Sequence, residues 1–370
     1  MEPLTILGSM SGTSLDGVDA AALVTDGERI LGFGPSAYRP YAAAERRTLR
    51  AALGRWPGEP GVAEAARVVE RAHAEAMAGL PGEVAAFHGQ TLAHEPDGRG
   101  THQAGDGGRL AQALGRPVVW DFRSADVLAG GQGAPLASAY HFACARLAGL
   151  TAPAAVLNLG GVSNLTWLDP MAEAPESPGA MLAFDAGPAN APLDDLLLAR
   201  RGGGFDEGGA LAASGRANEA VIEALLARDL LRRPPPRSYD RGDFADLVPA
   251  VAHLPDADAA ATLVAAVAAC VAAGLALCPS RPARVLVTGG GRRNAAIMSA
   301  LRERTGARVE PVEALGLDGD MLEAQAFAFL AARALRGLPL SFPGTTGVPR
   351  PLPGGRVSEP RPRAAASGGR

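Results

Sequence analysis

The chain opens with two apolar runs separated by a polar turn. Residues 4–7 and 18–24 are apolar, and the turn between them is rich in glycine and hydroxyl side chains. The pattern predicts a β-hairpin with a polar tip of about ten residues, where a hairpin normally needs two to five. Because glycines let a ligand approach the backbone, the tip is suited to a phosphate held by backbone N–H groups, although a merely flexible turn is the alternative.

Two carboxylates beside this tip are candidates for binding a metal ion. Asp16 and Asp19 lie where the turn passes into the second apolar run. Magnesium is usually bound through one or two carboxylates together with phosphate oxygens. We therefore expect Asp16 to contact Mg²⁺, directly or through water.

The same strand–turn–strand pattern returns in the middle of the chain. Residues 154–157 and 165–168 are apolar and flank the turn NLGGVSN at 158–164. Two such hairpins, each followed by helix and strand patterns, predict two similar α/β domains that face one another across a cleft. A third glycine turn, GGG at 289–291, follows the strand 284–287 and precedes a helix, whose N-terminus favours an anion.

Composition narrows the chemistry that these turns can perform. The chain has 370 residues, of which 47% are hydrophobic and 20% charged, and its net charge of −4 gives no electrostatic footprint for nucleic acid or an anionic membrane. All 35 basic residues are arginine. The absence of lysine excludes the P-loop, the protein-kinase lysine and Schiff-base catalysis, so phosphate must be held by backbone amides, arginine, hydroxyls and metal.

Cysteine usage and apolar stretches point to a reduced, soluble setting. Cys144, Cys270 and Cys278 have no metal-binding or paired spacing, so they are expected to be buried thiols. No signal peptide is recognisable at the N-terminus. Residues 259–278 carry no charge but are rich in alanine, which favours a buried core helix over a membrane span. We expect a cytoplasmic protein.

Asp185 is the strongest candidate for acid–base chemistry. It lies within the apolar segment 183–188, and a carboxylate at the end of an apolar strand can have a raised pKa and act as a general base. The alternative is a helix N-cap, since a helix pattern follows, but Gly187 is closer to that helix.

Arg123 is a second candidate, because it follows the buried strand 117–120 and a charge there needs a partner. A salt bridge to Asp121 or Asp126 would be a structural explanation. The functional alternative is a bidentate contact from the guanidinium to a ligand carboxylate.

Eight short motifs, in this order, resemble the 1,6-anhydro-N-acetylmuramic acid kinases of the sugar kinase, Hsp70 and actin superfamily. The resemblance covers about residues 4–347, and the motifs read GSMSGTSLDGVD, HGQT, QAGDG, DFRSADVLAGGQGAP, NLGGVSN, FDAGPAN, VTGGGRRN and DGDMLEAQAFA. The resemblance implies an α/β fold of two similar ribonuclease-H-like domains with a cleft between them, as in actin and hexokinase. It also implies an ATP- and Mg²⁺-dependent kinase that opens the anhydro ring with water and phosphorylates O6, giving N-acetylmuramic acid 6-phosphate in peptidoglycan recycling.

The resemblance assigns roles to residues of this chain. Asp185 would be the general base that activates the water. Nucleotide contacts would come from three turns: Gly12, Thr13, Ser14, Leu15, Asp16 and Gly17; Asn158, Gly160 and Gly161; and Gly289, Gly290, Gly291 and Asn294. Sugar contacts would come from His88, Thr91, Arg123, Gly187 and Glu323. The chain departs from the family at residues 237–242, RSYDRG, where members usually carry a Lys-Ser-Thr-Gly-Arg type of nucleotide-contact segment.

The expected domain division follows from the positions of these motifs. The first domain would comprise residues 1–130 and 322–345, and the second residues 131–321. The Pro-, Gly- and Arg-rich tail at 349–370 is expected to be disordered.

Two other functions are compatible with the pattern. A hexokinase-type amino-sugar kinase would use the same loops, and a non-catalytic nucleotide-dependent sugar sensor would share the fold without needing a carboxylate in the cleft. A glycoside hydrolase would explain ring opening but not two phosphate loops. For partners, we expect a small amino sugar and a homodimer, without nucleic acid or membrane.

Overall fold

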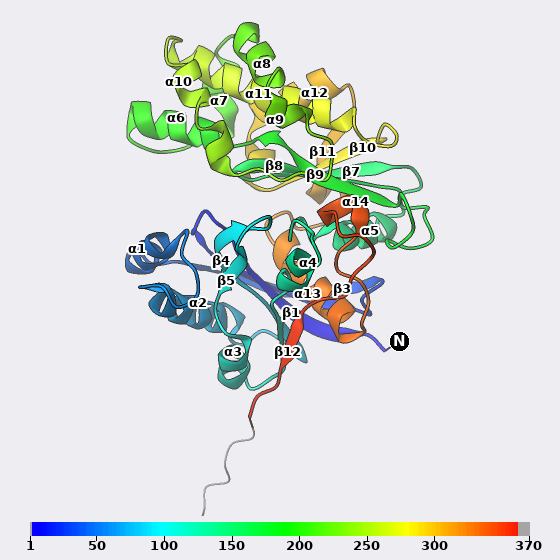
Figure 1. Cartoon of the computed structure of the whole chain (residues 1–370). Coiled ribbons are helices and arrows are strands. Elements are labelled where there is room, and N and C mark those ends of the chain that lie inside the picture. Colours follow the sequence, from blue (N-terminus) through cyan, green and yellow to red (C-terminus); the bar gives the residue numbers. More distant parts are fainter. Residues whose placement is uncertain (1, 362–370) are drawn as a thin grey trace, which may run out of the picture. The chain divides into compact units, whose positions relative to one another are not determined.

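The computed structural model describes residues 2–361, which form two compact units (Figure 1). Unit 1 comprises Met1–Gly133, Glu323–Ser341 and Pro351–Arg370, and unit 2 comprises Ala134–Leu322 and Phe342–Arg350. The chain thus returns to unit 2 at Phe342, whereas the sequence-based division kept residues up to 345 in the first domain.

Unit 1 is built on a mixed sheet of strand order β12-β6-β4-β1-β2-β3, with β5 paired to β4. The first three strands form an antiparallel meander, and β4 and β6 continue the sheet in parallel beside β1. The strands are β1 (Leu4–Ser11), β2 (Gly17–Thr25), β3 (Ile30–Pro40), β4 (Val84–Glu95), β5 (Gly100–Ala104), β6 (Val118–Trp120) and β12 (Arg356–Ser358).

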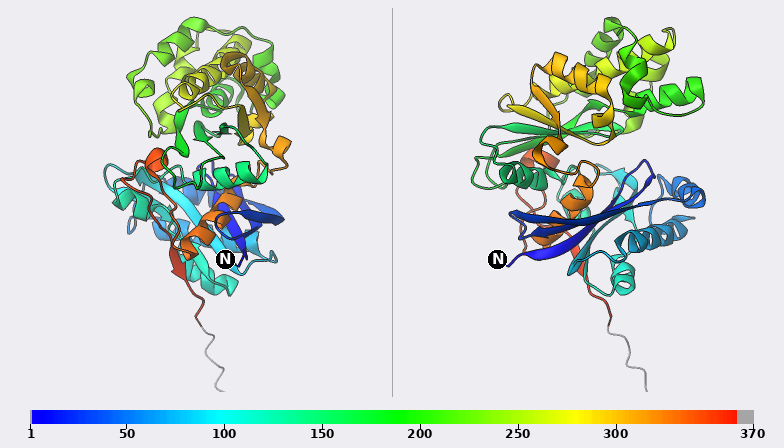
Figure 2. Two further views of the ribbon diagram at one scale, coloured as in Figure 1. Left: turned by 90° about the vertical axis from the view of Figure 1, so that its right-hand side faces the viewer. Right: turned by 180° about the vertical axis from the view of Figure 1, so that it is seen from behind.

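Helices cover both faces of the unit 1 sheet (Figures 1 and 2). Because side chains alternate along β1, Leu7 joins the core beneath α2 while Gly8 faces α13 on the other side. A Cβ at Gly8 would overlap the carbonyl oxygen of Ala324, so glycine is what lets α13 pack directly on the strand. The helices are α1 (Ala43–Ala52), α2 (Val62–Met77), α3 (Gly107–Leu114), α4 (Ser124–Leu128) and α13 (Leu322–Leu335).

Unit 2 repeats the same sheet with a five-stranded order of β11-β10-β7-β8-β9. Here β7, β8 and β9 form the antiparallel meander, and β10 and β11 follow in parallel beside β7. The strands are β7 (Ala154–Leu159), β8 (Val162–Leu168), β9 (Met181–Pro188), β10 (Arg284–Thr288) and β11 (Arg308–Pro311).

Unit 2 carries more helices than unit 1, most of them in the segment between β9 and β10. The α-helices are α5 (Ser138–Leu147), α6 (Ala191–Arg201), α7 (Ala210–Ala213), α8 (Glu219–Leu226), α9 (Asp229–Arg232), α10 (Leu247–Ala250), α11 (Asp256–Leu275), α12 (Ala295–Thr305) and α14 (Pro343–Thr346). Short 3₁₀ turns are η1 (Glu207–Gly209), η2 (Arg241–Phe244), η3 (Gly290–Arg293) and η4 (Val312–Leu315).

The two sheets share a five-strand path, which is β3-β2-β1-β4-β6 in unit 1 and β9-β8-β7-β10-β11 in unit 2; β5 and β12 are additions to the unit 1 sheet. This order, with its antiparallel meander and two parallel strands, is that of a ribonuclease-H-like domain. The predicted pair of similar ribonuclease-H-like domains is therefore confirmed by the strand pairing within each unit. The cleft between them stays a prediction.

The alanine-rich segment forms α11, the central helix of unit 2. By length and composition α11 could cross a membrane, but 72% of its apolar window is buried within the fold. Gly274 lets the helix approach β9, because a Cβ there would lie 3.2 Å from the Cβ of Ala186 and 3.4 Å from the Phe184 ring. The helix α11 therefore packs directly against β9, the strand that carries Asp185.

The prediction of a ten-residue polar tip on the first hairpin was wrong. The strands extend to Ser11 and resume at Gly17, which leaves a five-residue connection, residues 12–16. The hydroxyls of Ser9 and Ser11 are buried and hydrogen-bonded, to the Ala86 carbonyl (3.0 Å) and to Gln90 Oε1 (2.5 Å). Tertiary partners thus place polar residues inside a strand that looked like a loop.

The expected disorder from residue 349 was also wrong for the described part of the tail. Residues 356–358 form β12 antiparallel to β6, and Trp120 Nε1 donates a hydrogen bond to Ser358 Oγ at 3.0 Å. The Arg361 N–H donates to Gln112 Oε1 at 3.0 Å. Residues 362–370, also expected to be disordered, lie outside the described residues.

Candidate functional site

Loop 1, defined as Gly12–Asp16 between β1 and β2, is a tight turn with an exposed crest. Thr13, Ser14 and Asp16 are exposed, whereas Leu15 is buried with φ of +59° and anchors the turn in the unit 1 core. The Leu15 N–H donates to the Gly12 carbonyl at 3.2 Å. The hydroxyls and backbone of the crest therefore face solvent, as a phosphate loop requires, and Leu15 is a structural anchor within it.

Gly17 is a packing position at the end of this loop. A Cβ on Gly17 would lie 2.5 Å from the Arg39 carbonyl oxygen and 2.6 Å from the Tyr38 ring. Its glycine is thus explained by the neighbouring strand β3, and a role in nucleotide contact stays a prediction.

The carboxylates of Asp16 and Asp19 both lie close enough to Tyr38 to influence its pKa. Burial raises the pKa of the Tyr38 phenol, and the negative charges of Asp16 and Asp19 raise it further. Among the described residues no three acidic, histidine or cysteine side chains gather into a metal-binding cluster. A divalent ion held here would depend on these carboxylates together with phosphate oxygens.

His88 and Arg123 meet inside unit 1 as a directly bonded pair. The Arg123 guanidinium donates to His88 Nε2 from Nε at 3.2 Å and from NH2 at 3.0 Å, while His88 Nδ1 donates to the Gly89 carbonyl at 2.9 Å. Burial lowers the pKa of His88 well below its usual value, with Arg123 adding to the effect, so the imidazole is neutral. Both ring nitrogens of His88 are occupied, which leaves only the ring itself to face a ligand.

Arg123 does not make either of the salt bridges considered from the sequence. Its NH1 donates to the Gly133 carbonyl at 2.7 Å, and no ion pair joins it to Asp121 or Asp126 among the described residues. Asp121 lies 3.7 Å from Arg356 instead. Burial lowers the pKa of the Arg123 guanidinium to about 10, while nearby carboxylates, first Glu323, act to raise it. A cation held in this way is suited to an anionic ligand group.

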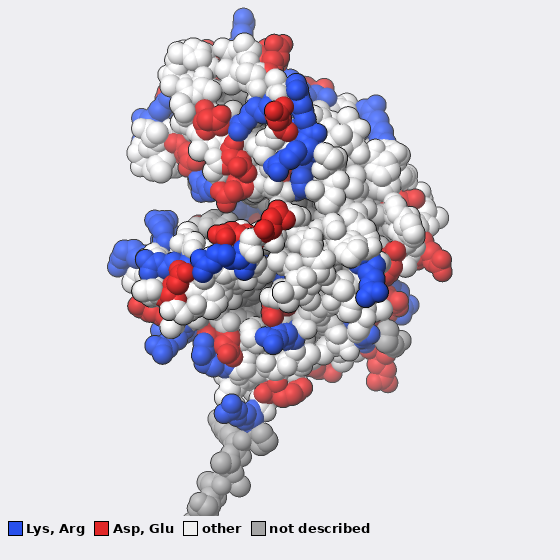
Figure 3. Space-filling model, in the orientation of Figure 1, with Lys and Arg blue, Asp and Glu red and all other residues white. Residues whose placement is uncertain are grey.

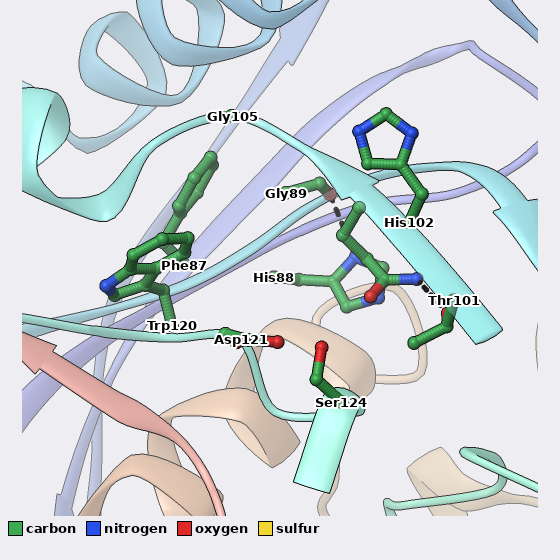
Figure 4. A pocket seen from close by; sticks show the side chains of 10 residues that line it. Phe87, His88, Gly89, Thr101, His102, Gly105, Trp120, Asp121 and Ser124 are labelled. Carbon is green, nitrogen blue, oxygen red and sulfur yellow. Dashed lines mark hydrogen bonds between the residues drawn. The ribbon is translucent and has the colours of Figure 1, made fainter. Parts of the chain in front are cut away.

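A cavity of about 160 Å³ opens beside His88, next to the middle of β4 and the carboxyl end of β6 (Figure 4). Its wall combines aromatic and polar side chains from three motifs: Phe87, His88, Gly89, Thr101, His102, Gln103, Gly105, Trp120, Asp121 and Ser124. Ligands commonly bind at such strand ends. The volume is that of a small polar molecule such as one sugar ring.

Of the five expected sugar contacts only His88 lines this cavity, and Thr91, Arg123, Gly187 and Glu323 lie outside its wall. Thr91 is half-buried, and its hydroxyl accepts a hydrogen bond from Gln103 Nε2 at 3.3 Å, so it supports the wall from behind. Glu323 is exposed in the first turn of α13. The strand that carries His88 and Thr91 continues to Glu95, because β5 pairs with it there.

In unit 2, the second hairpin turn and the GGG turn lie against each other. A Cβ at Gly289, whose φ is +76°, would lie 2.7 Å from the Leu159 carbonyl oxygen, and one at Gly291 would lie 2.6 Å from the Leu159 Cβ. Asn190 Nδ2 donates to the same Leu159 carbonyl at 2.8 Å. The predicted nucleotide residues Asn158, Gly160, Gly161, Gly289, Gly290 and Gly291 are thus brought together.

Asn294 ends this turn in a structural role. Its Oδ1 accepts a hydrogen bond from the Ile297 N–H at 3.1 Å, which makes it the N-cap of α12. The preceding Arg292 ties the turn down by donating to the Gly289 carbonyl at 3.0 Å and to Asp320 at 2.9 Å. A contact of Asn294 with adenosine stays a prediction.

Asp185 projects from β9 with both carboxylate oxygens engaged. Oδ1 accepts from Asn164 Nδ2 and Oδ2 from the Tyr239 N–H, each at 2.8 Å. Burial raises the pKa of Asp185 to about 6, against the lowering effect of these hydrogen bonds and of Arg237. It caps no helix, since Asn190 occupies the N-cap position of α6. A half-buried carboxylate with this pKa can accept a proton near neutral pH.

The segment that departs from the family pattern, residues 237–242, supports Asp185. Arg237 is buried; its Nε donates to the Asp185 carbonyl at 3.1 Å, and its own carbonyl accepts from the Asp185 N–H at 3.0 Å. Its guanidinium lies 5.2 Å from the centre of the Phe184 ring. In this chain the segment therefore fixes the strand and carboxylate of Asp185, whatever it contributes to nucleotide binding.

Gly187 is explained by packing. A Cβ at this position would lie 2.6 Å from the Cβ of Cys270 on α11, and the Gly187 carbonyl accepts a hydrogen bond from Ser163 Oγ at 3.0 Å. Its predicted contact with the sugar stays a prediction.

Sequence reasoning missed several residues that the geometry places at these sites. Asn164 lies in the NLGGVSN motif, so a polar residue paired across from β9 was a usable signal. Asp121 was considered only as a salt-bridge partner, but it lines the cavity and has φ of +56°, a strained backbone for a non-glycine residue. Tyr239 left no signal, because its contribution is a backbone N–H.

The face shown in Figure 3 has no large area of a single charge sign. Arginine and carboxylate side chains are interspersed on the face shown in Figure 3. Several are paired, such as Arg200 and Arg201 with Asp256, both at 3.0 Å.

Comparisons with known proteins show which sequences this chain is similar to. The family model described as anhydro-N-acetylmuramic acid kinase matches residues 4–358. The chain is 67% identical over 355 residues to the anhydro-N-acetylmuramic acid kinase of Cereibacter sphaeroides, covering 96% of each chain. It is 57% identical to that of a Ruegeria species, covering 97% of this chain and 96% of the relative. Among solved structures, a ROK family glucokinase from Streptomyces griseus with glucose and AMPPNP aligns with a TM-score of 0.39 and 14% identity, covering 89% of this chain and 99% of that one.

Proposed function

The chain belongs to the anhydro-N-acetylmuramic acid kinase family, and from this premise we propose how its residues carry out the reaction. It is an ATP-dependent carbohydrate kinase with a small-molecule sugar substrate. The substrate is 1,6-anhydro-N-acetylmuramic acid, and the proposed product is N-acetylmuramic acid 6-phosphate, formed by ring opening and phosphorylation together.

The observation that carries the mechanism is the environment of Asp185. Its pKa of about 6 keeps it largely ionised at neutral pH, yet basic enough to accept a proton from water. Asn164 and Tyr239 each occupy one oxygen and fix the plane of the carboxylate, which leaves further lone pairs to receive that proton.

In the proposed reaction, ring opening by water and phosphoryl transfer to O6 follow directly on each other. The water oxygen bonds to C1 of the sugar while its proton passes to Asp185, and the C1–O6 bond breaks. The electron pair left on O6 forms a bond to the γ-phosphorus of ATP, and the bond from that phosphorus to the β–γ bridging oxygen breaks, releasing ADP. The phosphoryl step needs positioning and charge neutralisation and no covalent help, which suits a chain without lysine.

The two units supply different parts of the binding. In unit 2, the turns around Gly160 and Gly289 would hold the nucleotide beside Asp185. In unit 1, the crest of loop 1 would hold phosphate through backbone N–H groups and hydroxyls. The sugar would enter the cavity next to His88, and the Arg123 guanidinium, which is bonded to His88, would supply the positive charge for the acidic lactyl group of a muramic sugar.

The donor set is compatible with a magnesium ion bound together with the nucleotide. Asp16 is an exposed carboxylate on loop 1 with Asp19 close by, and one or two carboxylates plus phosphate oxygens are a usual magnesium environment. When bound, the ion would neutralise charge on the transferring phosphates. We further propose that the enzyme acts in the cytoplasm as a homodimer, without nucleic acid or membrane as partner.

Replacing Asp185 tests the assignment of the base. Asp185→Asn keeps the size of the side chain but removes the proton acceptor, so turnover should fall about 10²–10⁴-fold while ATP binding, measured by calorimetry, is retained. Asp195→Asn is a matched control, because Asp195 makes a surface ion pair with Arg241 and should turn over normally when replaced. Near-normal turnover of Asp185→Asn would remove this residue as the base.

A further inference from the structure

Gln90 is buried beside the expected sugar-binding residues of β4, but its side chain points to loop 1. It is 0% exposed, and its amide is used completely. Nε2 donates to the Gly12 carbonyl at 3.2 Å and to the Thr91 carbonyl at 3.4 Å, while Oε1 accepts from Ser11 Oγ at 2.5 Å. A residue of the HGQT motif therefore contacts the phosphate loop and not the cavity.

Two further residues complete this arrangement. Ser11 Oγ also lies 3.0 Å from the hydroxyl of Tyr41, and the Tyr41 N–H donates to the Asp16 carbonyl at 2.9 Å. We call Ser11, Tyr41 and Gln90 the loop brace. All three are nearly or fully buried, and they hold both the first and the last residue of loop 1.

The brace sets the direction of a backbone donor. In a trans peptide the carbonyl of one residue and the N–H of the next point in opposite directions. The Gly12 carbonyl accepts from Gln90 Nε2 on the buried side and from the Leu15 N–H within the turn, both at 3.2 Å. With the carbonyl held inward by these two donors, the N–H of Thr13 is directed away from the protein core, on the exposed crest of the loop. An outward N–H beside hydroxyls is the element that binds an anion.

We propose that Gln90 is a positioning residue for nucleotide phosphate, which acts by fixing the Gly12–Thr13 peptide of loop 1. The proposal rests on the assignment of loop 1 to phosphate under the proposed function. The proposal gives two nearby residues of β4 different roles. Gln90 positions the loop that would bind the nucleotide phosphate, whereas His88 lines the cavity that would bind the sugar. A sequence-based assignment of the whole HGQT motif to the sugar would therefore be incorrect at Gln90.

Gln90→Met tests this proposal, since methionine has a similar length but cannot make the hydrogen bonds of Gln90 to Gly12 and Ser11. We expect the KM for ATP to rise about tenfold, as for the loss of hydrogen bonds of about 1.4 kcal/mol, with the KM for the sugar within twofold of wild type at saturating ATP. Tyr41→Phe removes only the outer bond to Ser11, so a rise of about threefold or less is expected, and this milder variant keeps the test open if Gln90→Met folds poorly.

Gln103→Met is the matched control, because Gln103 is a glutamine on the paired strand β5 whose position lines the cavity. It should show the opposite division, with a raised KM for the sugar and an unchanged KM for ATP. The proposal is overturned if Gln90→Met raises the sugar KM alone, or if it lowers the melting temperature while both KM values stay unchanged.

Gly12→Val separates this proposal from the assignment of the loop. A Cβ at Gly12 meets only Ser14 Oγ, at 3.6 Å, so the loop can accept the side chain while the approach of phosphate is blocked. An unchanged KM for ATP in Gly12→Val would show that loop 1 does not hold phosphate, and both assignments would fall. A raised KM in Gly12→Val together with an unchanged KM in Gln90→Met would overturn the brace alone.

Discussion

At the scale of single residues, the proposed chemistry depends on the pKa of Asp185, which burial and hydrogen bonding shift in opposite directions. Burial raises its pKa, and the donors Asn164 and Tyr239 lower it, with about 6 as the result. A deeper site without donors would keep the group protonated at neutral pH, and a fully solvated one would make it a weak base. The two donors differ in kind: one is a side chain that mutation can remove, and the other is a backbone N–H that it cannot.

The pH dependence of kcat/KM should report this balance. Asp185 must be ionised to accept a proton, so the rate should fall as the pH drops through about 6 in the wild-type enzyme. Asn164→Leu removes a donor that favours the charged form, so the pKa of Asp185 rises and the acidic limb should move up by roughly one pH unit. Rate profiles between pH 5 and 9 would measure the displacement.

Asn218→Ala is a suitable control for that profile. Asn218 caps α8 through the Ala220 N–H at 3.1 Å, so its loss should reduce stability without moving the limb. A profile of Asn164→Leu that coincides with wild type, or moves to lower pH, would contradict the account of Asp185.

At the scale of elements, the sequence predicted correctly those elements that the local pattern of apolar residues and glycines determines. Both hairpins, the GGG turn and the alanine helix lie where apolar runs and glycines placed them. The errors occur where a distant partner decides: buried hydrogen bonds place Ser9 and Ser11 inside β1, and pairing with β6 orders residues 356–358. The site followed the same rule, since Asp185 was visible as an acid in an apolar segment, while the Tyr239 backbone donor was not.

Gly8 tests the close packing of α13 on β1. In Gly8→Ala the new methyl group would overlap the Ala324 carbonyl and lie 2.7 Å from the Ala328 nitrogen, both on the helix backbone. Overpacking of this kind should lower the free energy of unfolding by about 1–3 kcal/mol in urea titrations. Gly32→Ala is the control on β3, where a Cβ meets only Val24 at 3.9 Å. Equal stability of Gly8→Ala and wild type would show that α13 does not constrain this position.

At the scale of the whole molecule, the proposed function requires both units to bind phosphate without lysine. The chain has 35 basic residues and all are arginine, so neither unit offers a lysine ammonium group for the nucleotide. Both instead present a hairpin turn at the first connection of the same sheet topology. Under the proposed function, strand order and turn position would take the part that a lysine has in other phosphate-binding folds.

The absence of lysine predicts that reagents that modify amines will have little effect on activity. Exhaustive acylation with an amine-specific reagent should leave kinase activity within about twofold of the untreated enzyme, because no lysine is present to react. An arginine-specific dicarbonyl serves as the positive control. Loss of activity under acylation, with a time course that follows modification of an amine, would show that an amino group takes part in phosphate handling.

The most direct test of the central claim is solvent ¹⁸O labelling of the turnover product. With ATP, Mg²⁺ and 1,6-anhydro-N-acetylmuramic acid in H₂¹⁸O, wild-type enzyme should release one ADP for each reducing 6-phosphosugar, and mass spectrometry of fragments from freshly quenched product should place the label at C1. The phosphate oxygens should stay unlabelled, since O6 comes from the anhydro bridge. ADP formed without label at C1, or formed only with free amino sugars, would contradict coupled ring opening and phosphorylation.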